Sequence, residues 1–275
     1  MKIRARVGTA LLLMPLVLGI TIYGTHGLFA GLCAVIVLAG IWEWAGLAAP
    51  QKRRWKAFVL LLTALLLLVC YCNINSVMTL FIVGLSLAWW GVALLLIVRQ
   101  QDGKKFSPGL MLQTGIGIIV LLPAWVALVA LHAAPDMQGP VLVTCLFILI
   151  WSADTAAYYV GQRWGRNKLA SQVSPGKTWE GLYGALGCGL LVATVYPLLL
   201  QMTLYKFILF LLVCLITIAM SVVGDLTESM IKRSGGVKDS GGWLPGHGGA
   251  LDRIDSLTAA APVFFTGVLL LERVS

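Results

Sequence analysis

The chain has 275 residues, of which 59% are hydrophobic and only 11% are charged, and its mean hydropathy is +0.92. This composition excludes an ordinary soluble protein and indicates a polytopic membrane protein. The net charge of +9 does not indicate nucleic-acid binding, because the basic residues are scattered between apolar segments instead of forming a patch with aromatic residues. The length leaves no room for a separate soluble domain, so we expect one membrane-embedded domain over residues 1–275.

Apolar segments long enough for membrane spans follow one another along the chain. They cover residues 7–23, 28–48, 57–72, 77–98, 109–133, 140–160, 179–200, 206–226 and 251–271. The first follows a basic start but has no small-residue cleavage site, so it is predicted to be a span and not a signal peptide. The sequence therefore predicts an all-α fold of about nine transmembrane helices, with N-terminal spans in residues 7–98 and catalytic spans and loops in residues 109–271.

Positive residues are distributed unequally between the predicted loops. Loops on the same side as the N-terminus hold 18 Lys and Arg residues, whereas the opposite side holds two, Lys206 and Arg273. Positive residues are enriched in cytoplasmic loops. The N-terminus is therefore predicted to be cytoplasmic and the C-terminus to lie outside.

Charge and glycine are concentrated in residues 221–256. This segment holds five of the eleven acidic residues, Asp225, Glu228, Asp239, Asp252 and Asp255. Paired carboxylates suit a divalent cation, the neighbouring Lys and Arg residues suit phosphates, and glycines let backbone N–H groups approach an anion. A merely solvated loop would not need so many acids and glycines beside membrane spans. The segment is therefore the predicted active site.

Two further polar segments interrupt or follow the apolar runs. Asp154 lies inside the 140–160 span, where an acid is costly enough to indicate a function. The loop that follows contains Ser174-Pro-Gly-Lys177-Thr-Trp-Glu-Gly181. Its Pro-Gly-Lys-Thr lacks the first glycine and the strand of a P-loop, so it does not predict a P-loop.

Glu43, near the end of the 28–48 span, is open to two interpretations: it snorkels to the lipid head groups or reaches the active site from the side.

The predicted acids lie near the cytoplasmic ends of three separate spans and thus at one depth in the membrane. Helical spacing puts Asp252, Asp255 and Ser256 on one face. The same spacing relates a second set, Asp225, Glu228, Ser229 and Lys232. The alternative interpretation is structural, with helix capping and with Arg233 or Arg253 neutralising the acids.

The motifs resemble those of a known family. Residues 229–239 read SMIKRSGGVKD and residues 244–255 read LPGHGGALDRID, while Asp154-x-x-Ala-Tyr158 precedes the SPGKTWEG segment. Together they are similar to the two recurring sequence blocks of the phosphatidate cytidylyltransferase (CDP-diacylglycerol synthase) family. Ala250 departs from the larger aliphatic residue usual there, which is a packing difference.

The resemblance implies a nucleotidyltransferase of the cell inner membrane. It would transfer the cytidylyl group of CTP to phosphatidic acid, giving CDP-diacylglycerol and pyrophosphate in phospholipid biosynthesis, on the cytoplasmic side. The phosphate nucleophile is already anionic, so alignment and charge neutralisation are the expected sources of catalysis. Mg²⁺, a second and monovalent cation, membrane lipid and a second copy of the chain are the other implied partners.

These expectations give each polar residue a role. The predicted catalytic residues are Asp225, Asp252, Asp255 and Lys232. Magnesium favours carboxylates together with substrate phosphates, so the first choice of metal ligands is Asp225 and Asp252, supported by Asp255 and Asp154. The predicted substrate-binding residues are Ser174, Lys177, Ser229, Arg233, Lys238, Asp239, His247 and Arg253. For His247, a nucleotide contact and a hydrogen bond within the loop remain equal alternatives.

Two other functions use similar residues. A CTP-dependent lipid kinase would need the same phosphate contacts but would release CDP. A cation-coupled transporter would also carry acids within its spans, although typically near the midplane and on discontinuous helices. The position of the acids at one side of the membrane favours the transferase.

Overall fold

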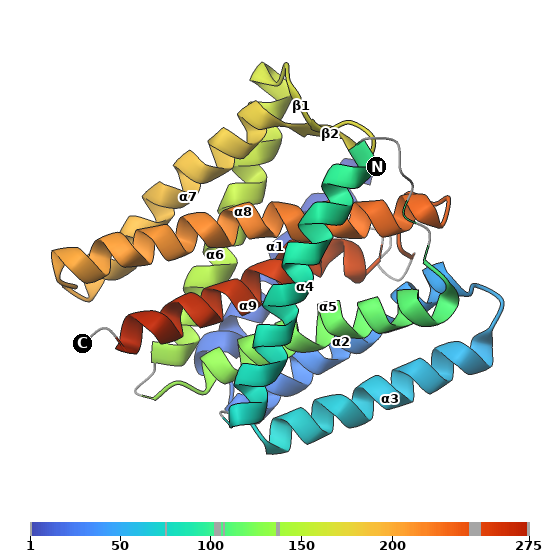
Figure 1. Ribbon diagram of the computed structural model, residues 1–275. Coiled ribbons are helices and arrows are strands. Elements are labelled where there is room, and N and C mark those ends of the chain that lie inside the picture. Colours follow the sequence, from blue (N-terminus) through green and yellow to red (C-terminus); the bar gives the residue numbers. More distant parts are fainter. Residues whose placement is uncertain are drawn as a thin grey trace. The chain divides into compact units, whose positions relative to one another are not determined.

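The computed structural model describes residues 2–74, 76–101, 106, 108–135, 138–241 and 249–273. Within these ranges the chain forms nine helices and one two-stranded sheet (Figure 1). The helices are α1 (Lys2–Tyr23), α2 (His26–Ala48), α3 (Arg53–Cys72), α4 (Val77–Gln101), α5 (Leu110–His132), α6 (Gln138–Trp164), α7 (Trp179–Leu199), α8 (Leu204–Ser234) and α9 (Leu251–Arg273).

The predicted all-α membrane fold is confirmed. Among the described residues, the eight helices α2–α9 are long and apolar enough to cross a membrane, and α1 has a shorter apolar part, Leu13–Tyr23. Several helices extend beyond the predicted spans; among them, α6 continues to Trp164 and α8 continues to Ser234. The extension of α8 makes the polar segment from Asp225 to Arg233 helical.

The only part of the described chain in a sheet is a small hairpin between α6 and α7 (Figure 1). Strand β1 (Lys168–Ala170) pairs antiparallel with β2 (Ser174–Thr178), with Lys168 opposite Thr178 and Ala170 opposite Ser174. The sequence had indicated only a loop here. The hairpin carries the SPGKT part of the predicted motif as its second strand.

The chain divides into two compact units, which are described separately. The first unit contains residues 1–82, 107–144 and 232–254. In this unit α2 packs against α3 and α5. The indole of Trp44 in α2 donates a 2.7 Å hydrogen bond to the Gln113 carbonyl of α5, and Gly117 leaves the space that its ring occupies. This hydrogen bond satisfies the indole N–H of a side chain that is buried within the protein.

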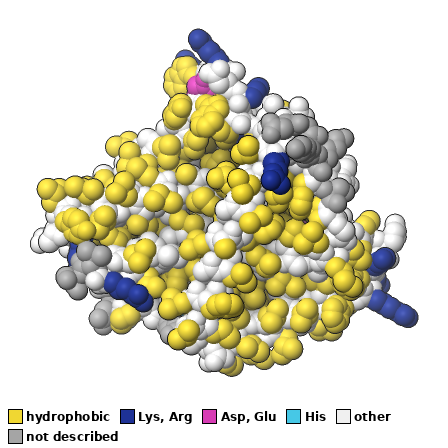
Figure 2. Space-filling view, viewed as in Figure 1, with side chains coloured by type: hydrophobic (Ala, Val, Ile, Leu, Met, Phe, Trp, Pro, Cys, Tyr) yellow, Lys and Arg dark blue, Asp and Glu magenta, His cyan; other side chains and the backbone are white. Residues whose placement is uncertain are grey.

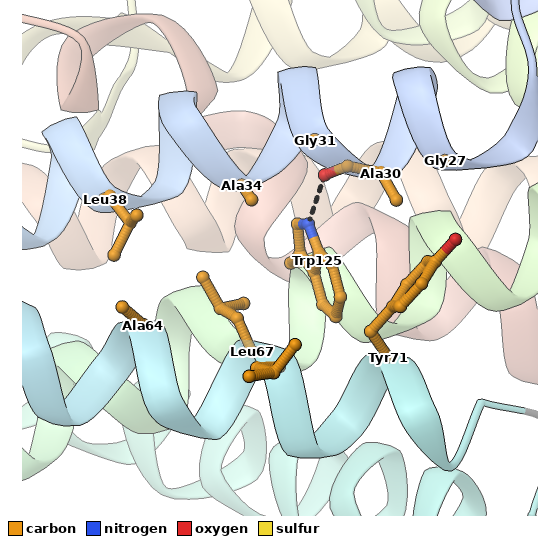
Figure 3. A pocket seen from close by; sticks show the side chains of 10 residues that line it. Gly27, Ala30, Gly31, Ala34, Leu38, Ala64, Leu67, Tyr71 and Trp125 are labelled. Atoms are coloured by element: carbon orange, nitrogen blue, oxygen red, sulfur yellow. Dashed lines mark hydrogen bonds between the residues drawn. The ribbon is translucent and has the colours of Figure 1, made fainter.

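A cavity of about 310 Å³ also lies in the first unit, between α2, α3 and α5 (Figure 3). Trp125 borders it and donates a 3.0 Å hydrogen bond to the Ala30 carbonyl. None of the residues that line it is charged. The cavity is therefore suited to apolar groups and not to phosphates.

The second unit contains residues 83–106, 145–231 and 255–275. Glycines permit close helix packing in it: Gly184 lies against Val160, Gly189 against Ile218, and Gly224 of α8 against the Asp255 carbonyl of α9. Such small residues are typical of helix interfaces in membranes, because they let the backbones approach closely. Aromatic residues also pack within this unit, with Phe210 and Phe264 edge to face at 6.1 Å between ring centroids.

The surface is apolar over most of the face seen in Figure 2, where Lys and Arg side chains stand in a few separate places. Leu61 of α3, Phe81 of α4 and Leu191 of α7 are each at least 70% exposed. Exposed apolar surface of this extent would be a liability in water. It is the surface expected of a protein surrounded by lipid.

Candidate active site

The hairpin in the second unit fixes the position of Lys177. Thr178, the next residue, caps α7: its Oγ1 accepts a hydrogen bond of 3.1 Å from the Gly181 N–H. Gly161 of α6 and Gly165, just after the end of α6, lie directly against the Thr178 side chain. Because Thr178 is held on both sides, Lys177 projects from a fixed point at the start of α7.

Glu180 holds the other end of the same hairpin. Its carboxylate accepts hydrogen bonds from the Arg166 and Asn167 N–H groups at 3.2 Å and from Asn167 Nδ2 at 2.8 Å. Glu180 is a residue for which the sequence predicted no role. The available signal was an acid in the first turn of a helix, where the helix dipole favours negative charge.

Lys177 reaches the predicted metal ligand Asp225. Its Nζ lies 2.5 Å from Asp225 Oδ2 and donates a longer hydrogen bond, 3.5 Å, to the Val222 carbonyl. On the same carboxylate, Oδ1 accepts a 3.3 Å hydrogen bond from Ser229 Oγ, one helical turn further along α8. The structure thus brings together Lys177, Asp225 and Ser229, all predicted from the sequence, and the Asp225 side chain remains 31% exposed.

A group of carboxylates surrounds this ion pair within the second unit. Asp154 of α6 accepts a 3.2 Å hydrogen bond from Ser256 Oγ. Asp225 lies close enough to both Asp154 and Asp255 for their like charges to repel. Asp255 also lies close enough to the buried side chain of Glu228 for their like charges to repel. Three helices therefore concentrate negative charge, which favours the binding of cations.

The oxygen donors of this group fit Mg²⁺ bound together with a substrate. Among the described residues, no three Asp, Glu, His or Cys side chains form a complete metal-binding cluster. Magnesium, however, usually keeps several waters and binds through one or two carboxylates plus substrate phosphates. A site of this kind needs no cage of three protein ligands.

In the first unit, Asp252 forms a second ion pair. Lys232 Nζ, in the last turn of α8, lies 2.7 Å from Asp252 Oδ1 in the first turn of α9. The Gly249 N–H donates a 2.8 Å hydrogen bond to Asp252 Oδ2, and the Ser240 N–H lies 3.3 Å from the same atom. The side chains of Lys232 and Asp252 are only 12% and 14% exposed. Two residues predicted to be catalytic are therefore in contact.

Glu43 takes part in the same arrangement. It is 4% exposed and accepts hydrogen bonds from Ser240 Oγ at 3.0 Å, Ala250 N at 3.1 Å and Leu251 N at 2.9 Å. Of the two interpretations of Glu43, the structure supports the one in which it reaches the predicted active-site segment from the side. It does not snorkel to the head groups.

The other predicted site residues differ in their exposure. Ser174 is half-buried in β2, whereas the more exposed ones are Arg233, Lys238, Asp239 and Arg253. His247 lies outside the described residues. Glu228 belonged to the predicted segment but received no role, although its spacing of three residues from Asp225 placed it on the same helix face.

Comparisons with known proteins identify the family to which the chain is similar. A family model described as "Cytidylyltransferase family" matches residues 4–271. A phosphatidate cytidylyltransferase of Pseudomonas aeruginosa is 39% identical over 262 residues, covering 95% of each chain, and that of Haemophilus influenzae is 37% identical, covering 95% of this chain and 97% of its own. That of Bacillus subtilis is 41% identical over 130 residues, 47% of this chain and 48% of its own. The resemblance found in the motifs is confirmed.

Proposed function

The chain belongs to the cytidylyltransferase family, and on this premise we propose that it transfers the cytidylyl group of CTP to phosphatidic acid. The products are CDP-diacylglycerol and pyrophosphate, and the reaction serves phospholipid biosynthesis. The observation that carries the proposal is the family match over residues 4–271, to which relatives named phosphatidate cytidylyltransferase add similarity over 95% of the chain.

The reaction needs little from the protein beyond alignment and neutralisation of charge. An anionic phosphate oxygen of phosphatidic acid forms a bond to the α-phosphorus of CTP. The bond between that phosphorus and the oxygen bridging to the β-phosphate breaks, and its electron pair leaves with pyrophosphate. No proton has to be removed from the nucleophile. Pre-positioned cationic groups that meet the developing negative charge are therefore the main source of rate enhancement.

Lys177 and Lys232 are the first candidates for these cationic groups. Each ammonium group is held on a carboxylate, Lys177 on Asp225 and Lys232 on Asp252. A phosphate oxygen competes with a carboxylate for the same kind of charge-assisted hydrogen bond. We assign the remaining substrate contacts to residues of the same two motifs, namely Ser174, Ser229, Arg233, Lys238, Asp239, His247 and Arg253.

Mg²⁺ is the proposed cofactor, and its proposed ligands are the carboxylates that the sequence indicates, Asp225 and Asp252 first, with Asp255 and Asp154 in support. When bound, it would withdraw charge from the phosphate oxygens as a Lewis acid. The hydrogen bonds of Ser229 and Ser240 to these carboxylates would orient them. The crowding of carboxylates around Asp225 also accommodates a second, monovalent cation, since further positive charge relieves their repulsion.

The reaction is tested with CTP labelled in turn at the α- and γ-phosphates, supplied to the purified protein with phosphatidic acid and Mg²⁺. We expect label from the α position to appear in lipid and label from the γ position to leave in pyrophosphate. Transfer of the γ-phosphate to lipid, with release of CDP, would establish a lipid kinase. If neither label reaches lipid, the transferase proposal is wrong.

We also propose an inner-membrane location with the N-terminus and the active site in the cytoplasm and the C-terminus outside, based on the charge asymmetry of the loops. Alkaline phosphatase fusions after Ser76, Gln138 and Ser275 should be active, because this reporter folds only outside the cytoplasm. Matched fusions after Lys52 and Gly235 should be inactive. An inactive reporter at Ser275, with the fusion protein present in the membrane, would contradict the nine-span topology.

A further inference from the structure

We infer that Glu43 is a positioning residue: its buried carboxylate holds both ends of the segment 240–250 and thereby orients Asp252 and Lys232. The inference rests on the proposed function, which gives these two residues their catalytic roles. It concerns contacts made entirely within the first unit, between α2, the end of α8 and the start of α9.

The start of α9 depends on Glu43 for its hydrogen bonds. The first N–H groups of a helix have no partners within the helix and usually bind a Ser, Thr, Asp or Asn side chain just before it. Here the preceding residues are Gly249 and Ala250, which offer no such acceptor. Glu43 supplies it from α2 by accepting from the N–H groups of Ala250 and Leu251. Negative charge is also favoured at this end of a helix.

The surrounding backbone is shaped to the Glu43 carboxylate. A Cβ atom at Gly241 would overlap Glu43 Oε1, and one at Gly249 would overlap Glu43 Oε2. The two glycines thus enclose the carboxylate from opposite ends of the segment. Any larger residue at either position would displace Glu43 or the backbone that carries its hydrogen bonds.

Ser240 connects Glu43 to the predicted catalytic pair. Its Oγ donates to Glu43 Oε2 at 3.0 Å, while its N–H lies 3.3 Å from Asp252 Oδ2. Asp252 in turn binds Lys232. A Ser at position 250 would cap α9 without the cost of burying a charge. The use of a carboxylate from α2 instead has the added effect of fixing Ser240, and through it the Asp252 carboxylate.

The test uses Glu43→Gln, which keeps the size of the side chain but replaces one acceptor oxygen with an NH₂ group. We expect kcat for cytidylyl transfer to fall by about 10- to 100-fold, as is usual when a partner that orients a catalytic group is lost, with little change in KM for CTP. Hydrogen exchange resolved to single amides should accelerate at Ala250 and Leu251 and also at Gly249, whose N–H binds Asp252. Glu43→Asp should retain more kcat than Glu43→Gln, because it keeps the charge.

Glu272→Gln, the same change at an exposed residue near the end of α9, is the control and should be silent. Ser240→Ala should lower kcat several-fold, but should add little to Glu43→Gln, since both remove the same link. This variant also serves as the test if Glu43→Gln does not fold.

Three results would each overturn the inference. They are a wild-type kcat in Glu43→Gln, an unchanged rate of exchange at Gly249 in that variant, and a fully additive loss of kcat when Glu43→Gln and Ser240→Ala are combined. If the wild type itself transfers no cytidylyl group, the proposed function fails, while the exchange comparison still tests the contacts of Glu43.

Discussion

Asp225→Asn and Asp252→Asn are each expected to lower the rate of cytidylyl transfer about a hundredfold or more while the protein still folds. Asparagine has nearly the same shape as aspartate but no charge. If each carboxylate helps Mg²⁺ to stabilise the transition state, its loss should cost on the order of 3 kcal/mol. The fall in rate is measured as turnover at saturating Mg²⁺ and CTP. Retained folding is measured by the extraction yield and by thermal unfolding.

The control for these two variants is Asp136→Asn, the same change in the loop that is predicted to lie on the outer side. Asp136 is outside the described residues, and its substitution should leave turnover unchanged. If the Asp225 and Asp252 variants melt like the wild type and keep more than about a tenth of its turnover, a loss below about 1.4 kcal/mol, they are not metal ligands. Asp154 and Asp255 would then be the next pair to test.

The sequence predicted the helices well because lipid imposes a simple rule on them. A largely apolar segment of about 20 residues that crosses a bilayer forms a helix, because each backbone group then finds its hydrogen-bond partner within the segment. The apolar span in α8 ends near residue 226, while the helix itself continues to Ser234, as the helical spacing from Asp225 to Lys232 predicted. Hydropathy marks where a helix leaves the lipid, and not where its hydrogen bonds end.

The candidate site was only partly predictable, because its residues make contacts of two kinds. The hydrogen bond between Ser229 and Asp225 follows from helical spacing and could be expected. The pairing of Lys177 with Asp225 and the contact of Glu43 with Leu251 join residues that are far apart in the sequence. Such contacts are set by how helices pack, and no local pattern indicates them.

Lys177→Gln is expected to lower kcat/KM for CTP about a hundredfold. The lysine is fixed by the cap of α7 and by Asp225, so its charge is already in place when a phosphate arrives. Removing one such pre-positioned donor typically costs about 10²- to 10³-fold. Lys177→Arg should retain part of the activity, because the charge remains but the planar guanidinium binds oxygen atoms with another geometry. Lys168→Gln, at an exposed position of the same hairpin, is the matched control and should have little effect.

The double variant Lys177→Gln, Asp225→Asn separates a catalytic ion pair from a structural one. If Lys177 and Asp225 only neutralise each other, each single change leaves one charge without its partner, and removing both should restore much of the activity and stability. If both act on the substrate and its metal ion, stability should recover while activity stays as low as in the poorer single variant. We expect the second outcome, because Asp225 remains partly exposed beside further carboxylates, where a charge is accessible to a ligand. Recovery of more than about a tenth of wild-type turnover in the double variant would show that the pair serves the fold alone.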